Sequence, residues 1–135
     1  MSSLVGIRQG LADNLASIPG LRTSWWAPDN PTPPIAVIVP ENVEYDAAFQ
    51  RGADTYTFRI IVIAQRADAR NAQSTLDSFC VPSGASSIKA AVESDKTLGG
   101  NADSCRVTNL TDYGPLAVGD TQYLAATFTV NVISS

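Results

Sequence analysis

The chain has 135 residues, which is the length of a single domain, and we expect one domain spanning residues 1–135. It contains no histidine, which excludes imidazole acid–base catalysis, Ser-His and Cys-His dyads, and histidine-ligated zinc. Its net charge of −4 argues against a dedicated nucleic-acid-binding surface and against docking on anionic lipid.

The first expected element is an amphipathic helix that ends at Pro19-Gly20, because proline and glycine commonly follow the end of a helix. Its apolar residues recur at steps of three or four positions and therefore share one face of the helix. These residues are Leu4, Ile7, Leu11, Leu15 and Ile18.

Two strands are expected next, separated by a proline-rich connector at 27–34. The first strand is short and covers residues 21–26. The second covers 35–39 and ends at Pro40. Because its residues are apolar on both faces, we expect it to lie at the centre of a sheet or under a helix.

A polar connection over residues 41–53 leads into a long strand at 55–65. Side chains on this strand alternate between its two faces, and one face changes from polar to apolar along its length. We therefore expect the first half of the strand to project from the body and the second half to be covered.

The second half of the chain predicts two helices and two strands. One helix runs from a cap at Asp68 to Phe79, and a shorter one begins at Ser86 or Ser87 and stops before Gly99-Gly100. A strand at 104–110, a loop at 111–120 and a strongly alternating strand at 122–133 complete the chain. A loop, not a helix, joins the last two strands, which makes them antiparallel.

Helices and strands thus come in blocks, which favours an α+β fold over a doubly wound sheet. The expected architecture is a mostly antiparallel sheet, with an N-terminal helix and one or two further helices packed on it. We see no continuous apolar stretch of membrane-spanning length and no secretory signal, so we expect a soluble protein made in a cytoplasm.

Cys80 and Cys105 are the only cysteines, too few for a disulfide framework or a Cys₄ zinc site. We interpret them as small buried apolar side chains, with a single disulfide as the alternative. The acidic residues near the polar connection lack the spacing of a calcium loop, and we interpret them as a solvated loop. We therefore predict no catalytic residues, metal site or cofactor site.

Five side chains are candidates for an interface with another chain. Trp25 and Trp26 are adjacent, so in a strand they point to opposite faces, and one of them needs cover from a neighbouring element or from a partner subunit. Tyr45, Phe49 and Arg51 lie in the polar connection, where the two aromatic rings either pack locally or contact another chain.

The segment 87–100 carries a short helix, an acidic residue and Thr97-Leu98-Gly99-Gly100 ahead of a strand. In this it resembles small neck and tail proteins of long-tailed bacteriophages, and most of all their tail terminator proteins. The resemblance extends over nearly the whole chain. It includes the opening helix with its Pro-Gly stop, the proline-rich segment before 35–39, the long strand before the second helix, and the closing strands around Tyr113-Gly114.

This resemblance implies a structural virion protein without enzymatic activity. It would form a homo-oligomeric ring, usually of six subunits, on the head-proximal end of the tail tube, in the virion after assembly in the host cytoplasm. Its partners would be the major tail tube protein and the head-closure or adaptor proteins of the connector, and genome DNA would pass through the lumen without specific binding. The alternatives are another neck ring, or a small α+β ligand-binding domain or enzyme.

Overall fold

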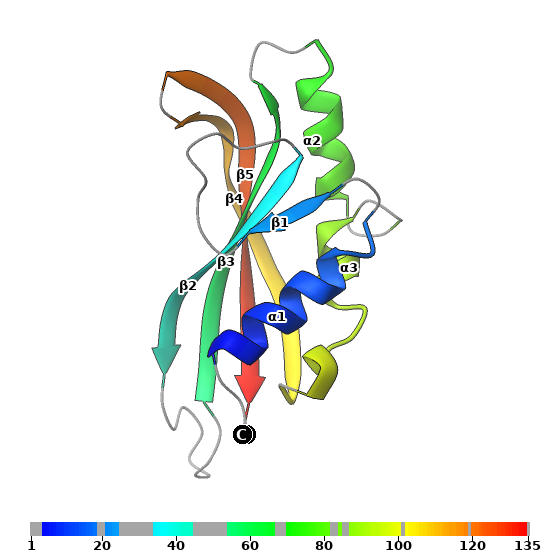
Figure 1. Ribbon diagram of the computed structural model, residues 1–135, viewed down its shortest axis with the longest axis vertical. Helices are drawn as coiled ribbons and strands as arrows, with labels where there is room; N and C mark the ends of the chain where they lie inside the picture. The colour runs from blue at the N-terminus through cyan, green and yellow to red at the C-terminus, as the bar shows by residue number, and fades with distance from the viewer. Residues whose placement is uncertain are drawn as a thin grey trace.

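A computed structural model of the chain describes residues 4–18, 21–24, 34–44, 54–66, 70–81, 84, 87–100, 102–118 and 120–134. Its centre is a five-stranded sheet in the order β1-β2-β3-β5-β4 (Figure 1). The elements in chain order are α1 (Leu4–Leu15), β1 (Arg22–Ser24), β2 (Ile35–Glu44), β3 (Asp54–Arg66), α2 (Ala72–Cys80), α3 (Ile88–Val92), the 3₁₀ turn η1 (Leu98–Gly100), β4 (Ser104–Val118) and β5 (Thr121–Ser134).

The sheet is antiparallel except at one edge, where the three-residue strand β1 runs parallel to β2. The closing strands β4 and β5 form an antiparallel hairpin, as expected. The structure therefore confirms an α+β fold with a mostly antiparallel sheet, an N-terminal helix and two further helices.

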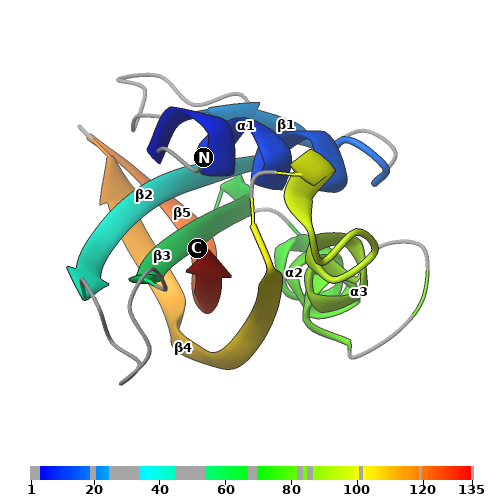
Figure 2. The ribbon, with the colours of Figure 1, turned by 90° about the horizontal axis from the view of Figure 1, so that it is seen from below.

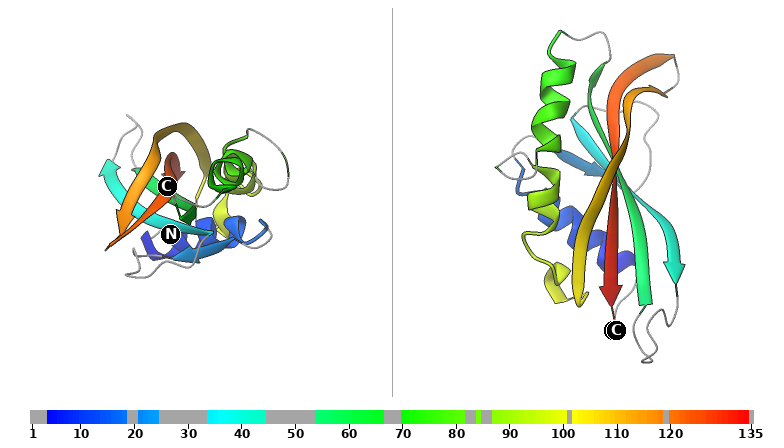
Figure 3. Two further views of the ribbon diagram at one scale, coloured as in Figure 1. Left: turned by 90° about the horizontal axis from the view of Figure 1, so that it is seen from above. Right: turned by 180° about the vertical axis from the view of Figure 1, so that it is seen from behind.

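All three helices lie against the same face of the sheet, which we call the inner face (Figure 2). From behind, the strands stand in front of α1 while α2 and α3 run alongside them, so the opposite face of the sheet is turned to the viewer (Figure 3, right). We call this opposite face the outer face. The chain is thus two-layered over its described part, with a helical side and a sheet side.

The inner face carries the main core, and the strand register explains its composition. Successive rows across the strands bring together Ile38, Ile60, Phe128 and Leu110, and then Pro40, Phe58, Val130 and Val107. The period-two alternation of each strand places these apolar side chains on one face. On α1, the side chains of Ile7, Leu11 and Leu15 are fully buried against them, as the spacing of three and four predicts.

The short helix α3 is held at its start by Ser87, whose side chain is fully buried. The Ser87 Oγ atom accepts a hydrogen bond from the Ala90 amide at 3.1 Å and donates one to the Val81 carbonyl at 2.5 Å. This is the N-cap arrangement, in which a hydroxyl satisfies a free amide of the first turn. No described helix is long and apolar enough to cross a membrane.

Three expected boundaries were wrong. β2 continues past Pro40 to Glu44, because a bulge between Pro40 and Asn42 absorbs the irregularity that proline introduces. Within the part of β2 beyond Val37 the pairing is with β3 alone, so a proline can be tolerated there. The second helix begins at Ala72, with Asn71 at its N-cap position, and the expected cap Asp68 lies outside the described residues.

The third wrong boundary was the loop expected at 111–120, most of which belongs to β4. Bulges between Val107 and Asn109 and between Thr111 and Gly114 keep the strand paired with β5 through the turn-forming residues. Asp112 takes a positive φ of 56° inside the second bulge. Residues 104–118 and 121–134 therefore make one long hairpin.

The expectation that the first half of the long strand projects from the body was also wrong. β3 is paired with β2 and β5 along both of its sides. Tyr56 and Phe58, in that first half, are 7% and 0% exposed. The polar residues of this half alternate with them on the outer face, where they meet solvent without the strand leaving the sheet.

Candidate functional site

The five interface candidates from the sequence, Trp25, Trp26, Tyr45, Phe49 and Arg51, lie outside the described residues. Their contacts therefore stay predictions. The described part of the chain presents two other features that can take part in binding: a pocket on the helical side and a polar area on the outer face.

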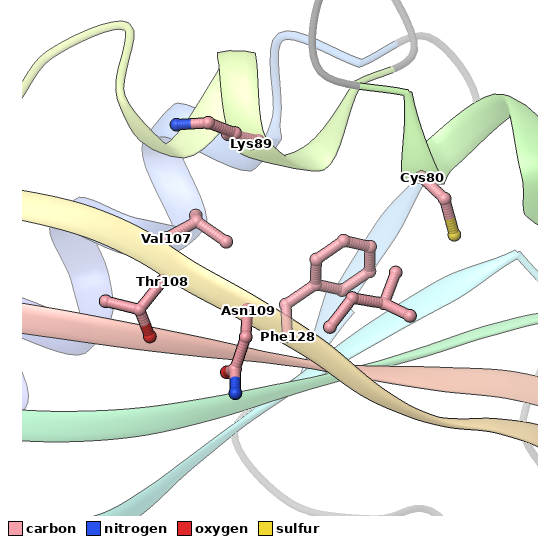
Figure 4. Close-up of a pocket in the computed structure, with 7 residues that line it drawn as sticks. Cys80, Lys89, Val107, Thr108, Asn109 and Phe128 are labelled. Carbon is pink, nitrogen blue, oxygen red and sulfur yellow. The ribbon is translucent and has the colours of Figure 1, made fainter.

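The pocket lies between the helices and β4 and has a volume of about 180 Å³ (Figure 4). The ring of Phe128 forms its floor, with Cys80 at one end and Lys89 at the other. The Lys89 ammonium forms an ion pair with the Glu93 carboxylate at 2.6 Å. That carboxylate also accepts a hydrogen bond from the Val107 amide at 3.0 Å. The pocket is therefore mainly apolar, and its single cation is already neutralised.

Both cysteines are free thiols. Burial raises the pKa of Cys80 to about 11, and the nearby Asp77 carboxylate adds to the rise. Burial also raises the pKa of Cys105 to about 11, with further contributions from Glu93 and Asp95. The environment thus favours the protonated, unreactive form of each thiol.

We predict that both thiols react slowly with an alkylating reagent at pH 8. A rise in pKa from 9.0 to about 11 lowers the thiolate fraction about a hundredfold at that pH. The folded chain holds these protons more tightly than the unfolded chain. The resulting contribution to the free energy of unfolding is therefore complete below pH 9 and is lost as the pH rises towards 11. Mass spectrometry of the native and the urea-unfolded protein after timed labelling measures the effect, and equal rates in the two states would contradict it.

The outer face is divided into an apolar and a polar half. At the end near the β4–β5 turn lies a small apolar cluster, with Ile35, Ile63, Tyr123 and Ala125 buried and Ile61, Leu116 and Val118 partly buried against them. The hairpin contributes Leu116 and Val118 from the end of β4 and Tyr123 and Ala125 from the start of β5. This half of the face is therefore a second, minor core.

The other half of the outer face carries mostly polar side chains in two consecutive rows across the sheet. One row is Val39, Arg59, Thr129 and Asn109, and the next is Asn42, Thr57, Asn131 and Arg106. Asn42, Arg106 and Asn109 are exposed, and the other side chains of the two rows are partly buried. We call Arg59, Thr57, Asn131 and Arg106 the arginine patch.

Asn131 is at the centre of the arginine patch. Its Oδ1 atom accepts a hydrogen bond from the Thr57 hydroxyl at 3.2 Å, which leaves the two amide protons available as donors. Arg106 is its direct cross-strand neighbour on β4, and Arg59 is a diagonal neighbour on β3. Neither guanidinium forms an ion pair within the described part of the chain, so the patch offers positive charge and the donors of two guanidinium groups and one amide.

The outer edges of the sheet are poorly suited to pairing with a further strand. β1 covers only Ile35–Val37 of β2, and the remaining edge of β2 carries Pro40 and the exposed acids Glu41 and Glu44. The edge of β4 has two bulges and Pro115. Proline, charge and bulges keep edges from pairing with a further strand, so association through these edges would have to use side chains and not backbone pairing.

The sequence contained part of the signal for the arginine patch. Period-two alternation assigns Thr57 and Arg59 to one face of the long strand, and Thr129 and Asn131 to one face of the last strand. What it did not contain is the strand order that places Asn131 between Arg59 and Arg106. That order follows from long-range pairing.

Within the described ranges, no group of three or more His, Cys, Asp or Glu side chains is placed to hold a metal ion. A scan of family models gives no match to this chain, and a search of curated proteins likewise finds none.

Proposed function

We propose that this chain is a structural protein of a bacteriophage virion that forms a ring at the head-proximal end of the tail tube. There it ends tube growth and joins the tail to the head connector. It acts by assembly, without catalytic turnover. This is the function implied by the resemblance of the chain, in element order and at residues 87–100, to tail terminator proteins.

The observation that best supports assembly is the difference between the two faces of the sheet. Helices cover the inner face, while half of the outer face bears partly exposed polar side chains and two arginines that form no ion pair with any described residue. Unlike surfaces on opposite sides of one protomer favour head-to-tail contacts, and such contacts close into a ring when the rotation between neighbours permits.

Within this assembly, the partners would be further copies of the chain, the major tail tube protein, and the head-closure or adaptor proteins of the connector. The lumen would let genome DNA pass without specific binding. Another neck ring, such as a head-closure or adaptor protein, is the nearest alternative. Joining assays that mix tubes, heads and the purified protein separate the two, because a terminator caps isolated tubes and a head-closure protein binds heads.

A ligand-binding domain is a second candidate, favoured by the pocket beneath α2 and α3. Its volume of about 180 Å³ is below the roughly 300–1,000 Å³ typical of sites for drug-sized ligands. The one charged group on its wall, Lys89, is already paired with Glu93. The pocket therefore supports a small apolar group better than a substrate with several polar contacts.

The native mass of the purified protein and of isolated virion necks tests the proposal. We expect one discrete closed oligomer of this chain in the necks, with six subunits as the expected number. Monomer alone, both in solution and in the particle, would rule the ring out.

A further inference from the structure

We propose that the arginine patch of one copy binds the acidic edge of β2 in a neighbouring copy, through Glu41 and Glu44. This inference rests on the proposed ring and assigns the side chains that join its subunits. It names a heterologous contact, in which two different surfaces of the same chain meet.

The two arginines are well placed to receive acidic side chains. Arg106 is exposed and Arg59 is partly buried, and neither has an ion-pair partner among the described residues. Arg59 on β3 and Arg106 on β4 are separated by two strand spacings across the sheet and by two residues along the strands. This places their Cα atoms about 12 Å apart. The amide of Asn131, oriented by Thr57, lies between them and adds a neutral donor.

The acidic partners lie on β2, which borders β3 with Arg59 and is separated from β4 with Arg106 by β3 and β5. Glu41 is the extra residue at the bulge of β2, and Glu44 is three residues further along. Both are exposed, and neither forms an ion pair in the described part of the chain. An extended strand separates them by about 10 Å, close to the spacing of the two arginines.

These placements favour contact between copies over contact within one copy. Glu44 shares the outer face with Thr55, Ile133 and Ser104, but β3 and β5 separate it from Arg106. The acids therefore cannot readily neutralise Arg106 of their own chain. Arg59 lies on the adjacent strand β3, but within the described residues it forms no ion pair with Glu41 or Glu44. A second copy, turned so that its β2 edge lies over the outer face of the first, brings opposite charges together.

An apolar contact is available beside the charges. Ile133 lies on the outer face in the row next to Asn131 and is 45% exposed. Val39, partly buried, lies in the same row as Arg59. An interface needs apolar area as well as charge complementarity, because exposed ion pairs by themselves contribute orientation more than affinity.

The guanidinium groups could also receive phosphate. We favour carboxylates because this chain itself carries, at matching spacing, two carboxylates without an ion pair among the described residues, whereas two arginines in a chain of net charge −4 give a weak polyanion site. Phosphate is therefore an outcome that the test must separate, and a short DNA duplex is the probe for it.

The test is a charge exchange measured by analytical ultracentrifugation at low ionic strength. We expect R59E/R106E and E41R/E44R each to weaken self-association at least about tenfold, and the quadruple variant to restore it to near the wild-type value. R70E/K96E is the matched control, since it makes the same change in net charge at exposed residues on the helical side. Circular dichroism confirms that each variant is folded, and R59Q/R106Q provides a milder pair if a reversal unfolds the chain.

The outcomes separate this inference from the proposed ring. Oligomers that are insensitive to both reversals, or a quadruple variant no better than the doubles, would overturn the pairing and leave the ring standing. If R59E/R106E abolished duplex DNA binding while self-association stayed unchanged, the patch would be a phosphate site and the pairing would also be wrong. Failure of the wild-type chain to associate at all, in solution and in virions, would overturn the ring together with the pairing.

Discussion

Replacing Phe58 with alanine is expected to lower the free energy of unfolding by about 3–5 kcal/mol. Phe58 is fully buried at the centre of the sheet, where β3 is paired on both sides. It lies in the inner-face row between Pro40 and Val130, so truncation leaves a cavity that flanking strands cannot easily close. Urea denaturation followed by circular dichroism measures the change.

Val5→Ala is the control for this experiment, since Val5 is 60% exposed on α1 and its truncation should change stability by no more than about 0.5 kcal/mol. Equal effects of the two substitutions would mean that Phe58 does not hold the core together. A large loss at Phe58 alone would support the strand register on which the outer-face rows also depend.

Gly10→Ala should destabilise the chain by about 1–3 kcal/mol, although alanine is the better helix former. A Cβ atom at Gly10 would lie 2.6 Å from the Leu98 Cβ and 2.7 Å from the Leu98 carbonyl oxygen. Leu98 is fully buried and holds a positive φ of 51° in the turn η1, so its backbone has little freedom to move aside. Helix α1 can approach η1 this closely only because residue 10 has no side chain.

Gly114→Ala is the matched control, because a Cβ there meets nothing within 4 Å and its φ is not in the left-handed region. We expect it to leave the thermal midpoint within about 2 °C of wild type, against a fall of roughly 4 °C or more for Gly10→Ala. A stabilised Gly10→Ala variant would show that α1 and η1 do not pack as closely as described.

The sequence predicted the elements whose patterns are strong and local. Residues 122–133 alternate cleanly because one face of β5 packs on the helices, and the strand is found there. The opening helix follows from Ile7, Leu11 and Leu15, which all face the core. In both elements a single buried face repeats at the period of its secondary structure, so local reasoning suffices.

Local reasoning failed where pairing overrides residue preference. Asp112, Gly114 and Pro115 are typical of a turn, yet β4 runs through them because pairing with β5 resumes after the bulge. Pro40 likewise predicted the end of β2, yet β2 stays paired with β3 beyond the bulge that follows Pro40. Neither bulge can be recognised without knowing the partner strand.

The arginine patch escaped prediction for a related cause. Arg59, Asn131 and Arg106 come from three strands, and only the order β3-β5-β4 makes them neighbours. The sequence pointed instead to Trp25 and Trp26 in the short strand and to Tyr45, Phe49 and Arg51 in the polar connection, because aromatic residues and arginine are common in interfaces. Those residues lie outside the described ranges, so the two sets of candidates are tested by separate substitutions.

Electron cryo-microscopy of the assembled particle at the junction of head and tail shows whether this chain forms the proposed ring. We predict a closed ring between tail tube and connector into which this fold fits, with the helical and sheet sides of neighbouring copies related by rotation about the tail axis. Absence of the chain from that junction, or its presence there as isolated single copies, would contradict the proposed ring.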